Sequence, residues 1–213
     1  MTATQVSARE LFQSAYENRY TWDKDFPGYT ADVTYRTGDR HFQGQARVSP
    51  DLKGAVSGIE DESATKAIEN QLWEIAIHRV RRPFEKTHAE NTFSYGKTDE
   101  TGAIEILIGG KGEGDHYKLR DNEVCMVHRH IHGVVVTINT FSSHDTGAGY
   151  LSHRYDSVYH DPKTGAQRGG RSVFTDEYES VGDYTLLKRR QIETETERGT
   201  EVQEFCFSNM QLL

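Results

Sequence analysis

Apolar residues recur at helical spacing in two stretches of the chain. The first stretch follows Ser7 and Glu10, which form an S-x-x-E capping box at the start of a helix. The second runs from residue 62 to about 81, carries one apolar stripe that includes Ile68, and is stopped by Pro83. The pattern therefore predicts an N-terminal helix and a long second helix.

Most of the remaining chain alternates between apolar and polar residues, as the strands of a half-buried sheet do. Two such segments, 29–36 and 41–48, are joined by a Thr-Gly-Asp-Arg turn and predict a hairpin. After the second helix the pattern indicates strands only, separated by turns rich in Gly and Asp. The strands predicted there are 92–95, 104–108, 117–120, 124–131, 134–141, 150–160, 172–179, 184–193 and 202–209.

About ten antiparallel strands with two helices predict an α+β fold. We expect a strongly curved antiparallel β-sheet, or half-barrel, whose concave face is covered by the long second helix. Such a sheet often encloses a ligand cavity. Since 213 residues are enough for one domain with a real core, residues 1–213 are predicted to form a single domain.

Charge and composition narrow the class of partner. The net charge of -8 disfavours nucleic acid, because phosphate binding requires a basic surface. The first residues have neither the basic nor the apolar segment of a secretory signal, and no stretch is apolar and long enough to span a bilayer. Two cysteines, Cys125 and Cys206, do not make a disulfide framework. We expect a cytoplasmic protein without a membrane span.

Several long segments carry a resemblance to a known family. They are Ser7–Phe12, Ala15–Trp22, Phe26–Tyr29, Gly96–Ala103, Asp145–Gly147 and Arg154–Tyr155. Together they make nearly the whole chain similar to a cyanobacterial and plastid family known mainly as a domain of unknown function. The resemblance implies a single small domain and, by analogy, a curved antiparallel sheet like that of lipoprotein carriers. It implies no catalytic residues, and the histidines of segment 128–132 depart from the family's usual pattern.

Those alternating histidines give the most specific chemical signal. His128, His130 and His132 stand at every second position, so a strand would place their imidazoles on one face. Neutral imidazole nitrogens suit Zn, Cu and Fe, and a catalytic metal needs only three protein ligands. We therefore predict a metal site with His128 and His130 as ligands, His132 as a third and His153 as a further one. Alternatives for the last position are His144, Asp156 and His160.

A hairpin would limit this set of ligands. If His132 and Gly133 form a two-residue tip, the tip histidine is poorly placed to share a metal. His128 then lies opposite Thr137, on the polar side of the hairpin. That side faces either a polar cavity or solvent, and the pattern does not decide between the two. In solvent, the histidines would be ordinary neutral surface residues.

A metal-free site is a second interpretation of the same region. A histidine and a tyrosine in a cavity can exchange protons with a substrate, since imidazole titrates near physiological pH. The predicted strand 150–160 offers Tyr155 for this role and Arg154 as a two-pronged anchor for a substrate carboxylate. The structural alternatives are sheet packing for Tyr155 and a cross-strand ion pair with Asp176 for Arg154.

The leading interpretation is a small-molecule enzyme that uses the histidine cluster, with metal assistance, on an organic metabolite. Its reaction would be of the lyase, isomerase, cyclase or oxidative type. Two non-catalytic interpretations stay open. One is a carrier of a hydrophobic ligand such as a pigment or a lipid, and the other is an assembly factor that binds a protein partner. The sequence indicates no oligomeric state.

Overall fold

A computed structural model describes residues 6–213, and contacts divide the chain into two compact units. Unit 1 comprises the residues up to Arg19 together with Arg82–Ser172. Unit 2 comprises Tyr20–Arg81 and Val173–Leu213. The expectation of one domain over residues 1–213 stays a prediction.

Each unit combines helices with neighbouring strands. Unit 1 contains α1 (Ala8–Glu17), α3 (Phe84–His88), β4 (Asn91–Thr98), β5 (Ile104–Gly110), β6 (His116–Arg120), β7 (Glu123–Ile131), β8 (Val134–Asp145) and β9 (Tyr150–His160). Unit 2 contains β1 (Tyr29–Thr37), β2 (Arg40–Val48), β3 (Gly54–Ser57), α2 (Glu62–Arg79), β11 (Tyr184–Thr196) and β12 (Gly199–Leu212). Strand β10 (Gln167–Val181) begins in unit 1 and ends in unit 2.

The strand order confirms a mostly antiparallel α+β fold. In unit 1 the order is β9-β8-β7-β6-β5-β4, with β10 beside β9, and in unit 2 it is β3-β2-β1-β12-β11, with β10 beside β11. The described residues therefore form twelve strands where about ten were expected, and eleven of them correspond to the segments predicted above. The additional strand is β3, whose four residues, Gly-Ala-Val-Ser, carry too weak a pattern to predict.

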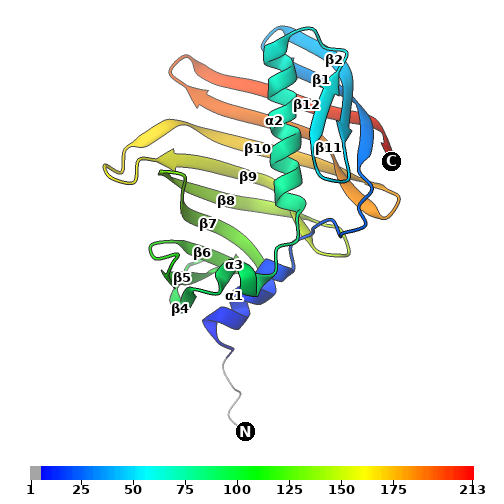
Figure 1. Cartoon of the computed structure of the whole chain (residues 1–213). Helices are drawn as coiled ribbons and strands as arrows, with labels where there is room; N and C mark the ends of the chain where they lie inside the picture. Colours follow the sequence, from blue (N-terminus) through cyan, green and yellow to red (C-terminus); the bar gives the residue numbers. More distant parts are fainter. Residues whose placement is uncertain (1–5) are drawn as a thin grey trace. The chain divides into compact units, whose positions relative to one another are not determined.

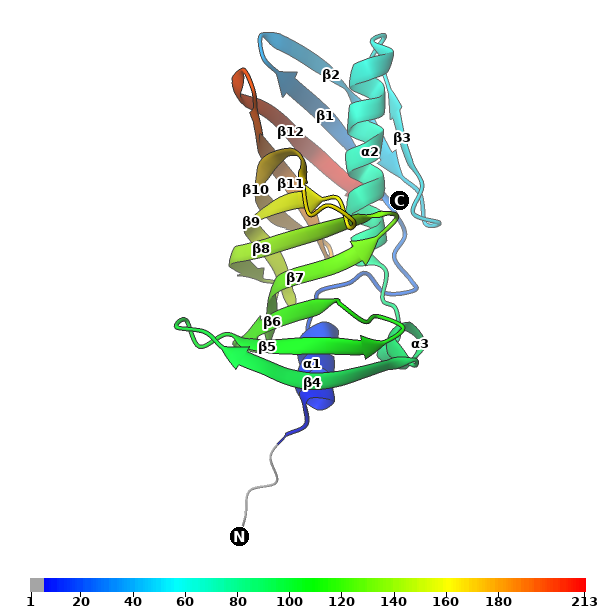
Figure 2. The same cartoon turned by 90° about the vertical axis from the view of Figure 1, so that its left-hand side faces the viewer.

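The predicted length of the second helix is wrong. Helix α2 has 18 residues and ends at Arg79, short of the predicted boundary. It ends there because Val80 is extended and the Arg79 carbonyl accepts a hydrogen bond of 2.8 Å from the Trp22 N–H. Its apolar stripe is confirmed, since Ile68 and Leu72 are buried, and the helix packs beside β3 (Figure 2). No helix among residues 6–213 is long and apolar enough to cross a membrane.

Helix α1 closes the core of unit 1. Its capping box forms as predicted, because Ser7 accepts from the Glu10 N–H while the Glu10 carboxylate accepts from the Ser7 N–H. The helix lies against one face of β4 and β7 (Figure 1). Phe12 is buried there, with its ring 4.6 Å from the ring of Tyr117 and 5.9 Å from that of Phe84. The covered face of this sheet is thus filled mainly by α1 and α3.

Candidate functional site

The predicted hairpin of strands β7 and β8 is confirmed residue by residue. His132 and Gly133 form its tip, with φ angles of 49° and 78°, which is the backbone of a type I′ turn. His128 lies opposite Thr137 and His130 lies opposite Val135, as expected. Histidine tolerates this left-handed backbone better than most residues, and glycine adopts it freely.

Four histidines share one face of the unit 1 sheet. His116 of β6 lies opposite His128 of β7. His130 of β7 and His160 of β9 both lie opposite Val135 of β8, one on each side of it. The rings of His116 and His128 are stacked, with centroids 4.3 Å apart and planes at 21°. The His130 ring lies 6.0 Å from that of His128. We call the face that carries His116, His128, His130 and His160 the histidine face.

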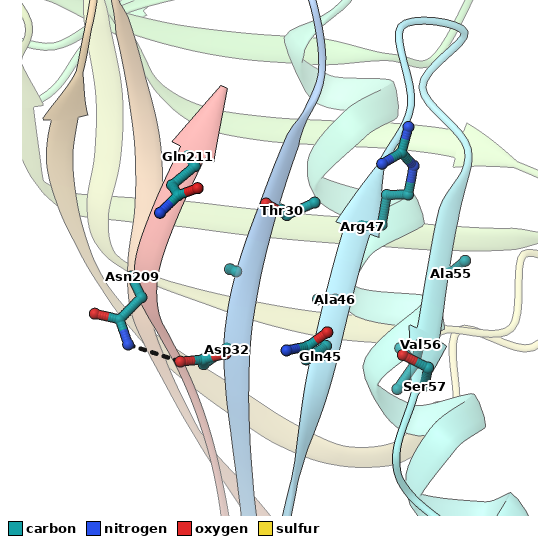
Figure 3. A pocket seen from close by; sticks show the side chains of 11 residues that line it. Thr30, Asp32, Gln45, Ala46, Arg47, Ala55, Val56, Ser57, Asn209 and Gln211 are labelled. Atoms are coloured by element: carbon teal, nitrogen blue, oxygen red, sulfur yellow. Dashed lines mark hydrogen bonds between the residues drawn. The ribbon is translucent and has the colours of Figure 1, made fainter. Parts of the chain in front are cut away.

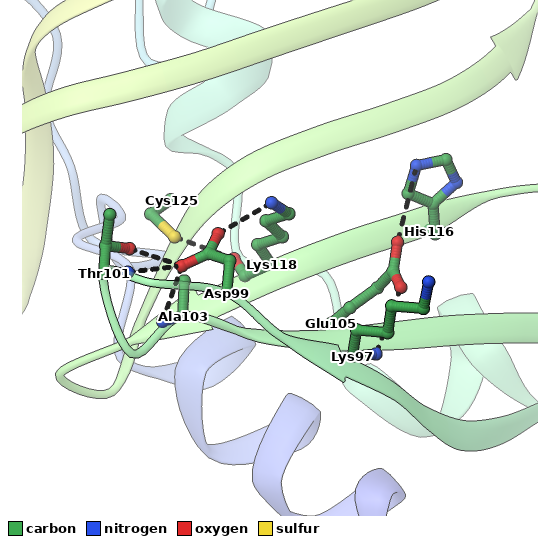
Figure 4. A network of polar contacts seen from close by, with 8 residues as sticks. All are labelled: Lys97, Asp99, Thr101, Ala103, Glu105, His116, Lys118 and Cys125. Carbon is green, nitrogen blue, oxygen red and sulfur yellow. Dashed lines mark hydrogen bonds and ion pairs between the residues drawn. The ribbon is translucent and has the colours of Figure 1, made fainter.

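Hydrogen bonds fix the positions of these imidazoles. His128 Nδ1 is 2.9 Å from Thr137 Oγ1. The Asp115 carboxylate accepts from the His130 backbone N–H at 2.8 Å and lies 3.1 Å from His130 Nδ1. His116 Nε2 lies 4.0 Å from Glu105 Oε1 (Figure 4). Burial lowers the pKa of His128, and the neighbouring charges of His116 and His130 lower it further.

The four predicted metal ligands are not brought together. His132 is exposed at the tip, and His153 Nδ1 is 2.8 Å from Ser142 Oγ. Thr137 lies opposite Val158, so His153 is five positions, or about 17 Å, along β9 from the level of His128. Residues 6–213 contain no group of three or more His, Cys, Asp or Glu arranged to hold a metal ion.

Tyr155 and Arg154 are also separated from the histidine pair. Tyr155 lies opposite Thr140, so strand alternation directs it to the sheet face away from His128. Arg154 lies opposite Ser142, and its guanidinium is 6.0 Å from the centre of the Phe141 ring. The metal-free acid–base site therefore stays a prediction, and neither of the two pockets described below includes Tyr155 or Arg154.

Two features of the histidine face were missed at the level of sequence. Asp115 ends the β5–β6 connection and His116 begins β6, about twelve residues before His128. Beside them, Lys118 donates to Asp99 at 2.7 Å, and Asp99 also accepts from the backbone of its own turn (Figure 4). These hydrogen bonds, led by that of Lys118, hold the pKa of Asp99 well below its usual range. The register of the β6–β7 hairpin, if it had been predicted, would have placed His116 opposite His128.

The larger described pocket lies in unit 2 and is polar. It measures about 640 Å³ on the sheet face formed by β12, β1, β2 and β3 (Figure 3). Asn209 Nδ2 donates to Asp32 there at 2.7 Å. Amides, hydroxyls and Arg47 surround this pair, and the floor is made of small residues. Hydrogen-bonding side chains and small apolar residues therefore share this lining.

A second pocket lies in unit 1 under α1, and we call it the α1 pocket. It measures about 280 Å³. It is lined by Leu11, Ala15, Thr101, Gly102, Ile104, Leu119, Arg120, Asp121 and Asn122. The lining of neither pocket includes His128 or His130.

Comparison with known proteins identifies a family. No curated protein matches the chain. One similar solved structure is the LolA superfamily protein NE2245 from Nitrosomonas europaea, with 10% identity, a TM-score of 0.39, and coverage of 98% of this chain and 94% of that chain. Another is a domain from Vibrio parahaemolyticus described as an outer membrane lipoprotein-sorting protein, with 10% identity, a TM-score of 0.39, and coverage of 96% and 91%. The family "Protein of unknown function (DUF3386)" matches residues 3–213, and the chain belongs to this family.

Proposed function

We propose that the protein is a non-catalytic carrier of a hydrophobic ligand with a polar end, bound in the α1 pocket. The observation that carries the proposal is the lining of this pocket, in which an apolar floor meets a polar rim. This is the arrangement that an amphipathic small molecule requires, because each part of the ligand then meets a matching surface.

The floor of the α1 pocket is built by three elements, one helix and two strands. Leu11 and Ala15 come from α1, while Ile104 and Leu119 come from β5 and β6. Both sheet residues belong to the apolar side of unit 1, together with the core around Phe12. A volume of about 280 Å³ is at the lower end of small-molecule sites, so one short acyl chain or a two-ring system would fill it.

The rim supplies hydrogen-bonding groups. Thr101, Asp121 and Asn122 belong to it. Asn122 is held in place there, because its backbone carbonyl accepts from the Asn18 side chain at 3.0 Å. Arg120 follows Leu119 on β6, so strand alternation directs its side chain to the opposite face of the sheet.

The position of the histidine face supports a carrier over an enzyme. Lys118 and Leu119 are consecutive on β6, so their side chains point to opposite faces, and His116 shares the face of Lys118. A ligand in the α1 pocket would therefore be separated from the stacked imidazoles by the sheet. In unit 2, the buried ion pair of Arg190 and Asp176 makes the helix-covered side unsuitable for an apolar molecule.

Dodecanoate binding measured by calorimetry tests the proposal. We expect the substitution Leu11→Trp to fill the pocket and weaken binding at least tenfold. The matched control is Leu107→Trp, which adds the same bulk on the opposite face and should leave binding unchanged. Arg120→Gln removes a charge whose side chain is directed to the opposite face, so it should also leave dodecanoate binding unchanged. Failure of the parent chain to bind dodecanoate, or equal binding by the Leu11 and Leu107 variants, would overturn the proposal.

A further inference from the structure

The histidine face is a surface whose charge depends on pH. Its four imidazoles come from β6, β7 and β9, and β8 lies between the last two. The closest ring centroids are 4.3 Å and 6.0 Å apart. Histidine is the side chain whose ordinary pKa lies nearest to physiological pH. Because these rings are clustered, their protonation changes the charge of a single patch rather than of scattered sites.

The other charged groups on this face are nearly balanced. Lys118 is paired with Asp99, and Arg171 is paired with Asp156 at 2.7 Å. The remaining charges come from Glu105 of β5 and from Asp115 of the β5–β6 connection. Arg129 contacts Asp115 at 3.6 Å, but it stands between His128 and His130 on β7 and is therefore directed to the opposite face. The connection after β9 adds the paired Asp161 and Arg168. With neutral imidazoles the face therefore carries a slight negative charge, and with four imidazolium groups it becomes clearly positive.

The face is also accessible and has an apolar residue at its edge. The His130 side chain is 48% exposed, and Leu107, opposite His116 on β5, is 40% exposed. Cations interspersed with exposed apolar side chains are what binding to an anionic bilayer requires, since the headgroups attract charge and the interface accepts apolar groups.

We propose that the histidine face docks on anionic phospholipid bilayers when its imidazoles are protonated. At neutral pH the net charge of -8 repels the whole chain from an anionic surface, so protonation of the four imidazoles both weakens the repulsion and creates the matching patch. Burial and the neighbouring imidazoles lower the pKa of His128, so this ring becomes charged only in more acidic solution than an ordinary histidine does. The proposal does not depend on a ligand in the α1 pocket.

Co-sedimentation with vesicles tests the docking. Vesicles of equal parts phosphatidylglycerol and phosphatidylcholine should bind the full chain at about pH 5, and little at about pH 7.5. Each cation near an anionic surface strengthens binding by about fivefold, so the double variant His116→Gln, His128→Gln should bind roughly 25-fold more weakly. Raising the salt concentration should weaken binding by the parent chain.

A matched control removes two histidines outside the face. His41 is exposed on β2, and His132 has the left-handed backbone that asparagine accepts. The double variant His41→Gln, His132→Asn should keep the acid-dependent binding of the parent. Equal binding to pure phosphatidylcholine vesicles, or equal loss in both double variants, would contradict docking through this face. Binding to a heparin column at about pH 5 without binding to vesicles would contradict the choice of a lipid surface.

Discussion

Breaking the buried ion pair between Arg190 and Asp176 is expected to lower the free energy of unfolding of unit 2. Two parallel hydrogen bonds join them, from Arg190 Nε to Asp176 Oδ1 at 2.8 Å and from Nη2 to Oδ2 at 2.6 Å. The arginine side chain is 5% exposed and the aspartate side chain 1%. Arg190 Nη1 also donates to Gln71 Oε1 of α2 at 2.9 Å, so the pair ties the helix to the strands.

Substituting Arg190→Met keeps an unbranched side chain of related length but leaves the Asp176 carboxylate buried without its bidentate partner. Loss of one member of a buried pair costs about 3–5 kcal/mol, and we expect a loss in that range here. For a chain of this size, such a loss lowers the midpoint of thermal unfolding by roughly 10 °C. The double variant Arg190→Met, Asp176→Leu removes both charges and should recover most of the lost stability.

Urea unfolding followed by circular dichroism measures these differences. The control is Arg36→Met, because Arg36 is 60% exposed and its contact with Glu204 is 3.3 Å. It should lose less than about 1 kcal/mol. If Arg190→Met lost no more than this control, or if the double variant were as unstable as the single one, the reasoning about buried charge would be refuted.

Two further predictions concern pH and helix capping. Burial, with Arg129 nearby, lowers the pKa of His88 to about 4 from 6.5, so the unfolded chain gains the proton first as the pH falls. Stability should therefore decrease by up to about 3 kcal/mol between about pH 6.5 and 4, and His88→Gln should remove that part of the pH dependence in urea titrations. Asp61 accepts from the Ala64 N–H at 2.8 Å at the start of α2, so Asp61→Ala should cost about 1 kcal/mol by the same assay. A flat pH profile in the parent, or an unchanged urea midpoint in Asp61→Ala, would contradict these two predictions.

The sequence predicted features that depend on neighbouring residues. The capping box of Ser7 and Glu10 needs only one turn of helix, and both of its hydrogen bonds are present. The β7–β8 register follows from a two-residue tip, so the opposition of His128 and Thr137 could be predicted as well.

Features that depend on distant segments were missed. The position of His116 beside His128 depends on the Asp121–Asn122 turn, where both φ angles are positive, and on a register shift between Lys118 and Leu119. A slip of one residue at that shift would move every side chain of β6 to the other face. The α1 pocket requires helix α1 to dock on strands that follow it by about ninety residues, and the pattern of α1 alone does not choose its partner.

Strand alternation keeps the two proposals experimentally separate. Leu119 lines the α1 pocket, while His116, three positions earlier on β6, belongs to the opposite face. A change on one face leaves the backbone hydrogen bonds and the side chains of the other face in place. Leu11→Trp should therefore abolish dodecanoate binding and keep acid-dependent vesicle binding, and the His116→Gln, His128→Gln variant should do the reverse. If either variant lost both activities while keeping its urea midpoint, the two faces would be coupled through the strands between them. Ligand occupancy would then regulate docking, which calorimetry in the presence of vesicles would measure directly.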